Sequence, residues 1–125
     1  MKILLSQQSD KSIYEQIAEQ IKNDILKGNS PPNEALPSIR KLAKELQVSV
    51  ITTKKAYEKL EREGLIYTRA GKGCFVAEYD NEKIKSDLKF EIQRELKLLR
   101  KKASESGISK SEWIDIIRKI SEEEF

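Results

Sequence analysis

The stretch LPSIRKLAKELQVSVITTKKAYEKLEREGLIYTRAGKGCFV, which runs from Leu36 to Val76, changes its hydrophobic period part-way along and so indicates a fold. After Ser38 the apolar residues recur every three or four positions, and after Ser49 they do so again as far as Glu63. This period is typical of an amphipathic helix, and serine is a preferred residue at a helix start. Two such helices joined by a short connection predict a helix-turn-helix.

The flanking segments complete a larger motif. From Leu65 the period changes to that of a strand, the turn residues AGKG follow, and residues 74–77 return as a second strand. Upstream, Ser12 and Glu15 have the spacing of a capping box that opens another helix, which Gly28 ends. The order of three helices and a hairpin predicts a mainly α fold with a small β-hairpin, a winged helix-turn-helix. The N-terminal run KILLS is expected to form a short strand or a strap.

A separate helical tail is expected from Asp80 onward, because no glycine or proline interrupts the sequence before Gly107. Its apolar stripe predicts an amphipathic helix of about 25 residues. A second capping box, at Ser109 and Glu112, predicts a short final helix. The large apolar residues of the final helix cover too wide an arc for a helix that lies alone, so a dimer partner or a ligand is expected to cover them. Trp113 is expected in a dimer core, with stacking on an effector as the alternative. We therefore expect dimerisation through a set of residues on both helices: Ile84, Leu88, Ile92, Leu96, Leu99, Trp113, Ile117 and Ile120.

Composition excludes several classes of protein. No run approaches the ~20 apolar residues that cross a bilayer, and no signal-peptide pattern begins the chain, so a cytoplasmic protein is expected. The sequence has no histidine, which removes the commonest proton shuttle and any histidine-based metal site. It also lacks a phosphate-binding P-loop. We expect neither an enzyme nor a cofactor. The single cysteine, Cys74, is expected to pack inertly, with redox sensing as the alternative.

The helix that follows Ser49 has two sides. One side is expected to face the core because its residues follow the spacing i, i+3, i+4, i+7: Thr53, Ala56, Tyr57 and Leu60. Val50 and Ile51 are then left pointing outward beside Lys54. In a DNA major groove such apolar side chains pack on thymine methyl groups, and Ser49 or Thr52 can donate hydrogen bonds. The alternative is that Val50 or Ile51 packs against the neighbouring helix.

The sequence resembles the DNA-binding domain of GntR-family bacterial transcription regulators over about residues 12–77. The resemblance depends on a dense set of motifs: Leu36-Pro37-Ser38, Arg40, Leu42-Ala43, Val48-Ser49, Leu60 to Ile66, Gly71-Lys72-Gly73 and Phe75-Val76. The compact tail resembles that of the YtrA-like branch, in which the tail dimerises the protein. The resemblance implies a sequence-specific, homodimeric DNA-binding regulator, most simply a repressor on a palindromic operator. Release by a small-molecule effector is left open.

The resemblance also assigns site residues. Arg40 matches an arginine that contacts DNA in the family, while Val50 stands where many larger members have an arginine. Gln47 replaces a common glycine in the turn, and Cys74 replaces a threonine in the wing. Together with the outward face and the wing, the candidate DNA contacts are these: Ser38, Arg40, Ser49, Val50, Ile51, Thr52, Lys54, Lys55, Arg69, Gly71 and Lys72. The alternatives are a surface ion pair for Arg40, a solvated charged face for Lys54 and Lys55, and a simple turn requirement for Gly71.

The expected organisation is therefore a winged helix-turn-helix DNA-binding domain at residues 1–79 and a helical dimerisation tail at residues 80–125, with an effector region left open in the tail. The charge distribution agrees with this division. Residues 1–79 hold 13 Lys/Arg against 10 Asp/Glu, whereas residues 80–125 hold 11 of each. The expected partners are double-stranded DNA and a second copy of the chain, with no membrane. The alternative is a winged-helix module that binds another protein without specific DNA binding.

Overall fold

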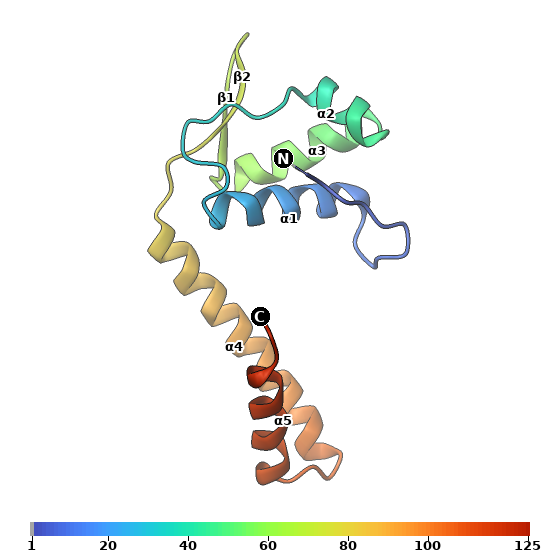
Figure 1. Cartoon of the computed structure of the whole chain (residues 1–125), viewed down its shortest axis with the longest axis vertical. Coiled ribbons are helices and arrows are strands. Elements are labelled where there is room, and N and C mark those ends of the chain that lie inside the picture. The colour runs from blue at the N-terminus through green and yellow to red at the C-terminus, as the bar shows by residue number, and fades with distance from the viewer. Residues whose placement is uncertain (1) are drawn as a thin grey trace. The chain divides into compact units, whose positions relative to one another are not determined.

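The computed structural model describes residues 2–125 and confirms the expected fold class, a winged helix-turn-helix followed by two C-terminal helices (Figure 1). Contacts divide the chain into two compact units, one ending at residue 79 and the other comprising residues 80–125. The elements are, in chain order, α1 (Ile13–Leu26), α2 (Ile39–Leu46), α3 (Val50–Arg62), β1 (Ile66–Arg69), β2 (Gly73–Val76), α4 (Asn81–Glu105) and α5 (Lys110–Glu122).

Helix α3 is the central element of the first unit, since it contacts α1, α2 and β1. The four residues expected to face the core are all buried, which confirms the helical phase: Thr53, Ala56, Tyr57 and Leu60. On α1 the buried residues include Ile17, Ile21 and Ile25, spaced four apart along one side. Burying a side chain of this size contributes about 1.5–3 kcal/mol, so this interface supplies much of the stability of the unit.

The wing is an antiparallel pair in which Ile66 lies opposite Val76 and Arg69 opposite Gly73. The second strand thus begins at Gly73, one residue earlier than expected, because Gly73 still pairs with Arg69. The segment that leads into α2 is attached to this hairpin. The Leu36 N–H donates to the Cys74 carbonyl oxygen (2.9 Å), and Ala35 forms a bridge with Phe75. The wing and the start of α2 are therefore held together.

The N-terminal segment is a strap on α1 and forms no strand among its described residues. Two glutamine side chains of α1 satisfy its backbone. The Leu4 N–H donates to Oε1 of Gln20 (2.8 Å), while Nε2 of Gln20 donates to the Leu4 carbonyl oxygen. Gln16 does the same with the N–H and the carbonyl oxygen of Ser6, each at 2.8 Å. The amide groups of Gln16 and Gln20 thus replace a neighbouring strand.

Helices α1 to α4 end in the same way. In each, an N–H just beyond the end donates to a carbonyl oxygen five residues earlier, as the Val48 N–H does to Ala43 after α2 (3.0 Å). The residue directly before the donor needs a positive φ, and in three of the four helices it is a glycine: Gly28, Gly64 and Gly107. Helix α2 uses Gln47, with φ 56° and ψ 45°. The departure from glycine noted in the sequence therefore falls on a left-handed position.

The second unit is a pair of contacting helices, α4 and α5. Asp80 caps α4 by accepting a hydrogen bond from the Lys83 N–H (3.1 Å). The capping box expected at the start of α5 is present, because Ser109 and Glu112 each accept a hydrogen bond from the other's N–H. These bonds hold the pKa of Glu112 below its ordinary value of 4.5. Within residues 80–125 only Ala103 is buried, so the tail has almost no core of its own.

Replacing Gln47 with glycine is expected to stabilise the protein. A left-handed conformation costs a residue with a Cβ roughly 1–2 kcal/mol, and glycine removes this cost. Because glycine has more conformational freedom in the unfolded chain, roughly half of the gain in stability is lost again. We expect Gln47→Gly to raise the free energy of unfolding by about 0.5–1 kcal/mol in urea titrations. The matched control is Lys44→Gly, inside α2, which should lower it by about 1 kcal/mol. Destabilisation by both variants would contradict the assigned strain.

Candidate nucleic-acid interface

The start of α3 exposes two large apolar side chains. Val50 is 42% exposed and Ile51 is 70% exposed, so neither is a buried core residue. The side chain of Lys54 is exposed one turn further along the same helix. Leaving a side chain like that of Ile51 in water forgoes about 1.5–3 kcal/mol of burial, which a binding partner can recover. The face expected to point outward does so.

Ser49 and Thr52 form hydrogen bonds with each other at the start of α3. The Ser49 hydroxyl accepts from the Thr52 N–H (3.0 Å) and donates its own proton to the Thr52 hydroxyl oxygen (2.8 Å). Both functions of Ser49 are thus used within the protein. The Thr52 O–H remains available as a donor at the outer surface, oriented by Ser49. Of the two hydroxyl groups, Thr52 is the one placed to contact a ligand.

The two adjacent lysines of α3 have different surroundings. Nζ of Lys54 lies 4.0 Å from the Glu58 carboxylate, at the limit of an ion pair, and both side chains are exposed. Such an exposed pair contributes little to the stability of the fold, so Lys54 can exchange Glu58 for a phosphate. Nζ of Lys55 lies 5.8 Å from the centre of the Tyr14 ring of α1, a cation–π distance. Lys55 therefore stands on the side of α3 that faces α1. Its contact with Tyr14 has no signal in the spacing of the sequence.

A buried hydrogen bond sets the start of α2. The hydroxyl of Tyr57, which is 2% exposed, donates to the Pro37 carbonyl oxygen (2.7 Å). Burial raises the pKa of this tyrosine far above its ordinary value. Ser38 follows as the N-cap and accepts from the Lys41 N–H (3.1 Å). Arg40 is exposed two residues later, in the first turn of α2.

The wing tip presents cations around a glycine. Arg69 and Lys72 are exposed, and the Lys72 N–H donates to the Arg69 carbonyl oxygen (3.0 Å) to close the turn. Gly71 has a φ of 75°, a conformation that side chains with a Cβ rarely adopt. Below the tip, Tyr67 and Phe75 stack with ring centroids 5.5 Å apart. The two cations thus flank a turn whose bare glycine permits close approach of the backbone.

Cys74 is a buried residue of the wing strand β2, with its Sγ 3.4 Å from the Thr68 hydroxyl oxygen. This placement suits the packing role expected from the sequence. Among residues 2–125 no group of three or more metal-ligating side chains could hold a metal ion. Over the same residues, no helix is both long enough and apolar enough to cross a membrane.

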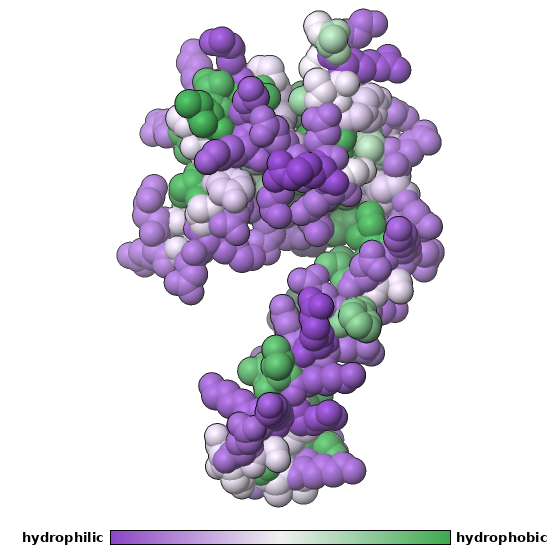
Figure 2. Space-filling model, turned by 180° about the vertical axis from the view of Figure 1, so that it is seen from behind, coloured by the Kyte–Doolittle hydropathy of each residue, from purple (hydrophilic) through white to green (hydrophobic). Residues whose placement is uncertain are grey.

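The tail residues expected to dimerise lie uncovered or half-covered. Ile84, Leu88, Trp113 and Ile117 are half-buried, whereas the remaining members are exposed: Ile92, Leu96, Leu99 and Ile120. Green apolar patches interrupt the purple surface of these helices in Figure 2. The sequence reasoning missed Phe90 and Leu98, which are 67% and 65% exposed. They lie outside the regular stripe, so its periodicity did not indicate them.

Residues 13–76 match the family described as bacterial regulatory proteins, gntR family. The chain belongs to the GntR family. This is a family of DNA-binding transcriptional regulators and not of enzymes. The family resemblance, which the sequence motifs had suggested, is confirmed, and the interface described above is the helix-turn-helix and wing of such a regulator.

Two relatives of this GntR chain match it over nearly its whole length, and both are proteins of Bacillus subtilis. The uncharacterised regulator YhcF is 36% identical over 92% of this chain and 94% of its own. The repressor YtrA is 35% identical over 95% of this chain and 92% of its own. The similarity extends through the tail, in agreement with the compact branch suggested by the sequence.

Solved structures support the fold. A transcriptional antiterminator from Listeria monocytogenes has a TM-score of 0.72, with 29% identity over 98% of this chain and 91% of that chain. AraR(DBD), solved in complex with its operator ORR3, has a TM-score of 0.50, with 32% identity over 60% of this chain and 96% of that chain. The second similarity covers about the length of the first unit.

Removing the Tyr57 hydroxyl is expected to loosen the start of α2. Tyr57→Phe leaves the Pro37 carbonyl oxygen without its donor, which should cost about 1–2 kcal/mol of unfolding free energy. The matched control is Tyr67→Phe, which removes the same atom from an exposed hydrogen bond to Asn33. That variant should change the stability by less than about 0.5 kcal/mol. Equal effects in thermal unfolding would show that the buried bond has no special role.

Proposed function

We propose that the protein is a homodimeric repressor that acts in the cytoplasm and binds a palindromic operator in double-stranded DNA. Residues 1–79 are its DNA-binding domain and residues 80–125 its dimerisation tail. The observation that carries the proposal is the divided surface of α3, which buries one side in the core and leaves Val50 and Ile51 exposed beside Lys54. Two comparisons support it: YtrA is a repressor, and AraR(DBD) binds an operator.

In the proposed complex the start of α3 lies in the major groove. Val50 and Ile51 contact thymine methyl groups, and Thr52 donates to a base edge or a phosphate. Ser49 acts by orienting Thr52. Lys54 neutralises a phosphate, and Lys55 does so only when it leaves the Tyr14 ring.

The start of α2 and the wing supply the other proposed contacts. Ser38 and Arg40 reach the phosphate backbone beside the groove, since both are exposed at the start of α2. The wing tip, with Arg69, Gly71 and Lys72, approaches a minor groove or the adjacent phosphates. The hydrogen bonds between the wing and the segment before α2 keep these contacts at fixed spacing.

The tail supplies the second copy of the DNA-binding surface. A pair of chains related by two-fold symmetry presents two α3 helices to half-sites about one turn of DNA apart, roughly 34 Å. The stripe residues of α4 and α5 are exposed or half-buried in one chain, and a second copy would bury them. Such a dimer explains why the tail can be stable with so little core of its own.

Selection of bound sites from random duplex DNA tests the proposal most directly. We expect an enriched palindrome with half-sites one helical turn apart and thymines at the positions that face Ile51. Replacing those thymines with uracil, which lacks the methyl group, should weaken binding, while uracil elsewhere in the site serves as the control. If no sequence is enriched and low salt gives no retardation of DNA, the protein-interaction module becomes the better hypothesis.

Removing the proposed phosphate contacts should weaken DNA binding without unfolding the protein. For Arg40→Ala and Lys54→Ala we expect about tenfold weaker binding each, because a hydrogen bond to a charged group contributes about 1.5 kcal/mol. Wild-type binding should fall with salt with a log–log slope of roughly −5 to −9, and each variant should make the slope shallower by about 1 for every phosphate left without its cation. Lys59→Ala is the control, since Lys59 pairs with Glu63 (3.1 Å). Unchanged affinity in both variants would refute this docking.

Charges on the tail stripe should separate the two copies. Leu88→Asp combined with Leu96→Asp places two carboxylates in the proposed apolar interface, at a cost that surrounding carbons cannot offset. We expect the variant to sediment as a 14.4 kDa monomer and the wild type at twice that mass. Leu98→Asp is the matched control on the same helix, outside the stripe, and should remain dimeric. A double variant that stays dimeric would place the interface elsewhere.

A further inference from the structure

A cavity of about 590 Å³ lies where α4 turns into α5, wholly within the second unit. Its volume is within the roughly 300–1,000 Å³ of small-molecule sites in proteins. The lining combines four cations with one large aromatic residue: Lys97, Arg100, Lys101, Lys110 and Trp113. The proposed DNA contacts include none of these side chains, and only Trp113 among them belongs to the set expected to dimerise.

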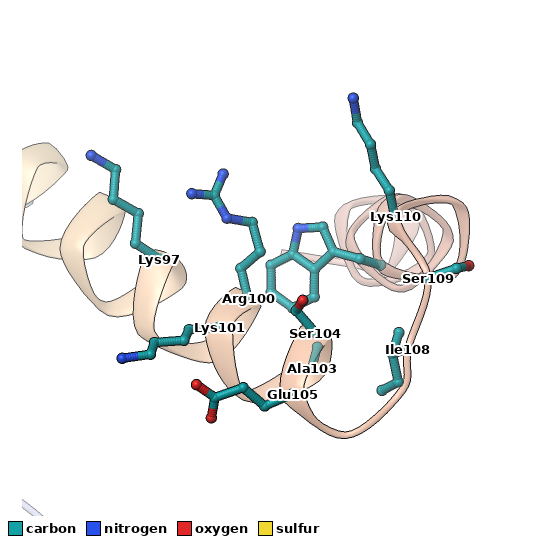
Figure 3. A pocket seen from close by; sticks show the side chains of 10 residues that line it. Lys97, Arg100, Lys101, Ala103, Ser104, Glu105, Ile108, Ser109 and Lys110 are labelled. Atoms are coloured by element: carbon teal, nitrogen blue, oxygen red, sulfur yellow. The ribbon is translucent and has the colours of Figure 1, made fainter.

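The positive charge is concentrated at this place. Residues 97–110 contain five Lys/Arg and one Glu, although residues 80–125 as a whole contain equal numbers of cations and anions. The ion pairs found within residues 2–125 involve other lysines, so the four lining cations have no carboxylate partner there. In the view of Figure 3, Lys97, Arg100 and Lys110 extend to one side of the helices, whereas Lys101 extends away from them on the side of Glu105. The like charges of Lys97, Arg100 and Lys110 repel one another until an anion binds between them.

Trp113 adds a flat apolar surface to the cationic lining. It is the single tryptophan of the chain and is only half-buried. Its indole N–H is a hydrogen-bond donor, so the lining can bind negative charge and a planar ring together. Planar rings stack on indole, and the guanidinium of Arg100, on α4, offers a second planar group in the lining. A ligand that uses the whole lining therefore carries both a ring and several negative charges.

Two of the cavity's cations lie on a different face of α4 from the dimer stripe. Successive helical residues are about 100° apart, which places the mean direction of Lys97, Lys101 and Ser104 about 140° from that of the stripe around Leu96 and Leu99, and Arg100 about 70° from it. A second copy that covers the stripe therefore leaves Lys97 and Lys101 accessible and has Arg100 at its edge.

We propose that this cavity is an effector site that binds a small polyanion carrying a flat ring, of the chemical class of nucleoside triphosphates. The inference rests on the proposed function, because an effector can act only if the protein binds DNA with an affinity that the effector alters. Ligand binding at the connection between α4 and α5 alters how the two tail helices pack, and the tail is the element proposed to join the two DNA-binding domains. Occupancy of the cavity therefore changes the affinity for the operator.

Tryptophan fluorescence reports directly on the site, since Trp113 is the only emitter of its kind. Excitation beyond the absorption of the nucleotide avoids an inner-filter effect. The full-length protein is titrated with ATP, with inorganic tripolyphosphate, which lacks the ring, and with adenosine, which lacks the charge. We expect a saturable change with ATP and at least about tenfold weaker binding of the other two, because each of them lacks one of the two groups that the lining binds. The absence of a saturable ATP response would overturn the proposal.

Variants separate the cavity from the DNA surface. Arg100→Gln and Lys101→Gln should each weaken ATP binding about tenfold by calorimetry. Lys85→Gln is the matched control, because it removes the same charge from α4 outside the cavity lining. Retention of wild-type ATP affinity by both cavity variants would overturn the assigned site.

Operator retardation with and without ATP tests the effector role. We expect ATP to change the operator affinity of the wild type and of Lys85→Gln, and to have at least about tenfold less effect on Arg100→Gln. An equal effect on Arg100→Gln would mean that ATP competes at the DNA surface, and unchanged operator affinity at saturating ATP would remove the effector role. Quenching of Trp113 by DNA that ATP competes away would make the cavity a phosphate-backbone contact instead. If the protein retards no DNA even without ATP, the proposed function fails, while the fluorescence titration still decides whether the cavity binds the ligand.

Discussion

The packing of α3 against α1, α2 and β1 is the constraint on which the first unit depends. A helix held on several sides cannot rotate, because its buried residues would have to leave the core and its exposed ones enter it. Tyr57 has a double part in this arrangement. Its ring lies in the core, and its hydroxyl fixes the Pro37 carbonyl oxygen before α2. The same buried side of α3 thus determines both where its exposed side points and where α2, which carries Arg40, begins.

Much of this fold could be predicted from the sequence, because the signals are local. Capping serines at positions 12, 38, 49 and 109 and the change of period at Leu65 are readable without any structure. The burial of Thr53 and Tyr57 followed from helical spacing alone. The GntR motifs indicated the family, and the match over residues 13–76 confirms it. For such features, local chemistry and the packed structure agree.

The features that could not be predicted depend on contacts between residues distant in sequence or on side-chain rotamers, which the periodicity of the sequence does not indicate. The position of Lys55 over Tyr14 joins two helices that are far apart in sequence. The use of both functions of the Ser49 hydroxyl depends on a rotamer. The cavity beside Trp113 depends on how α4 and α5 meet, whereas the sequence indicated only an effector region left open in the tail and an alternative role for Trp113 in stacking on an effector. The DNA contacts themselves stay predictions, since the start of α3 departs from the family at Val50.

The paired glutamines of α1 show how a helix can take the place of a strand. Four residues along a helix rise about 6 Å, and two residues of extended chain advance about 6.6 Å. Gln16 and Gln20 are four apart, and their partners Ser6 and Leu4 are two apart, so the two repeats are commensurate. Side-chain amides carry both donor and acceptor groups, as a peptide group does. Gln16 and Gln20 therefore act as a template that fixes the register of the extended N-terminal segment along α1, with no sheet required.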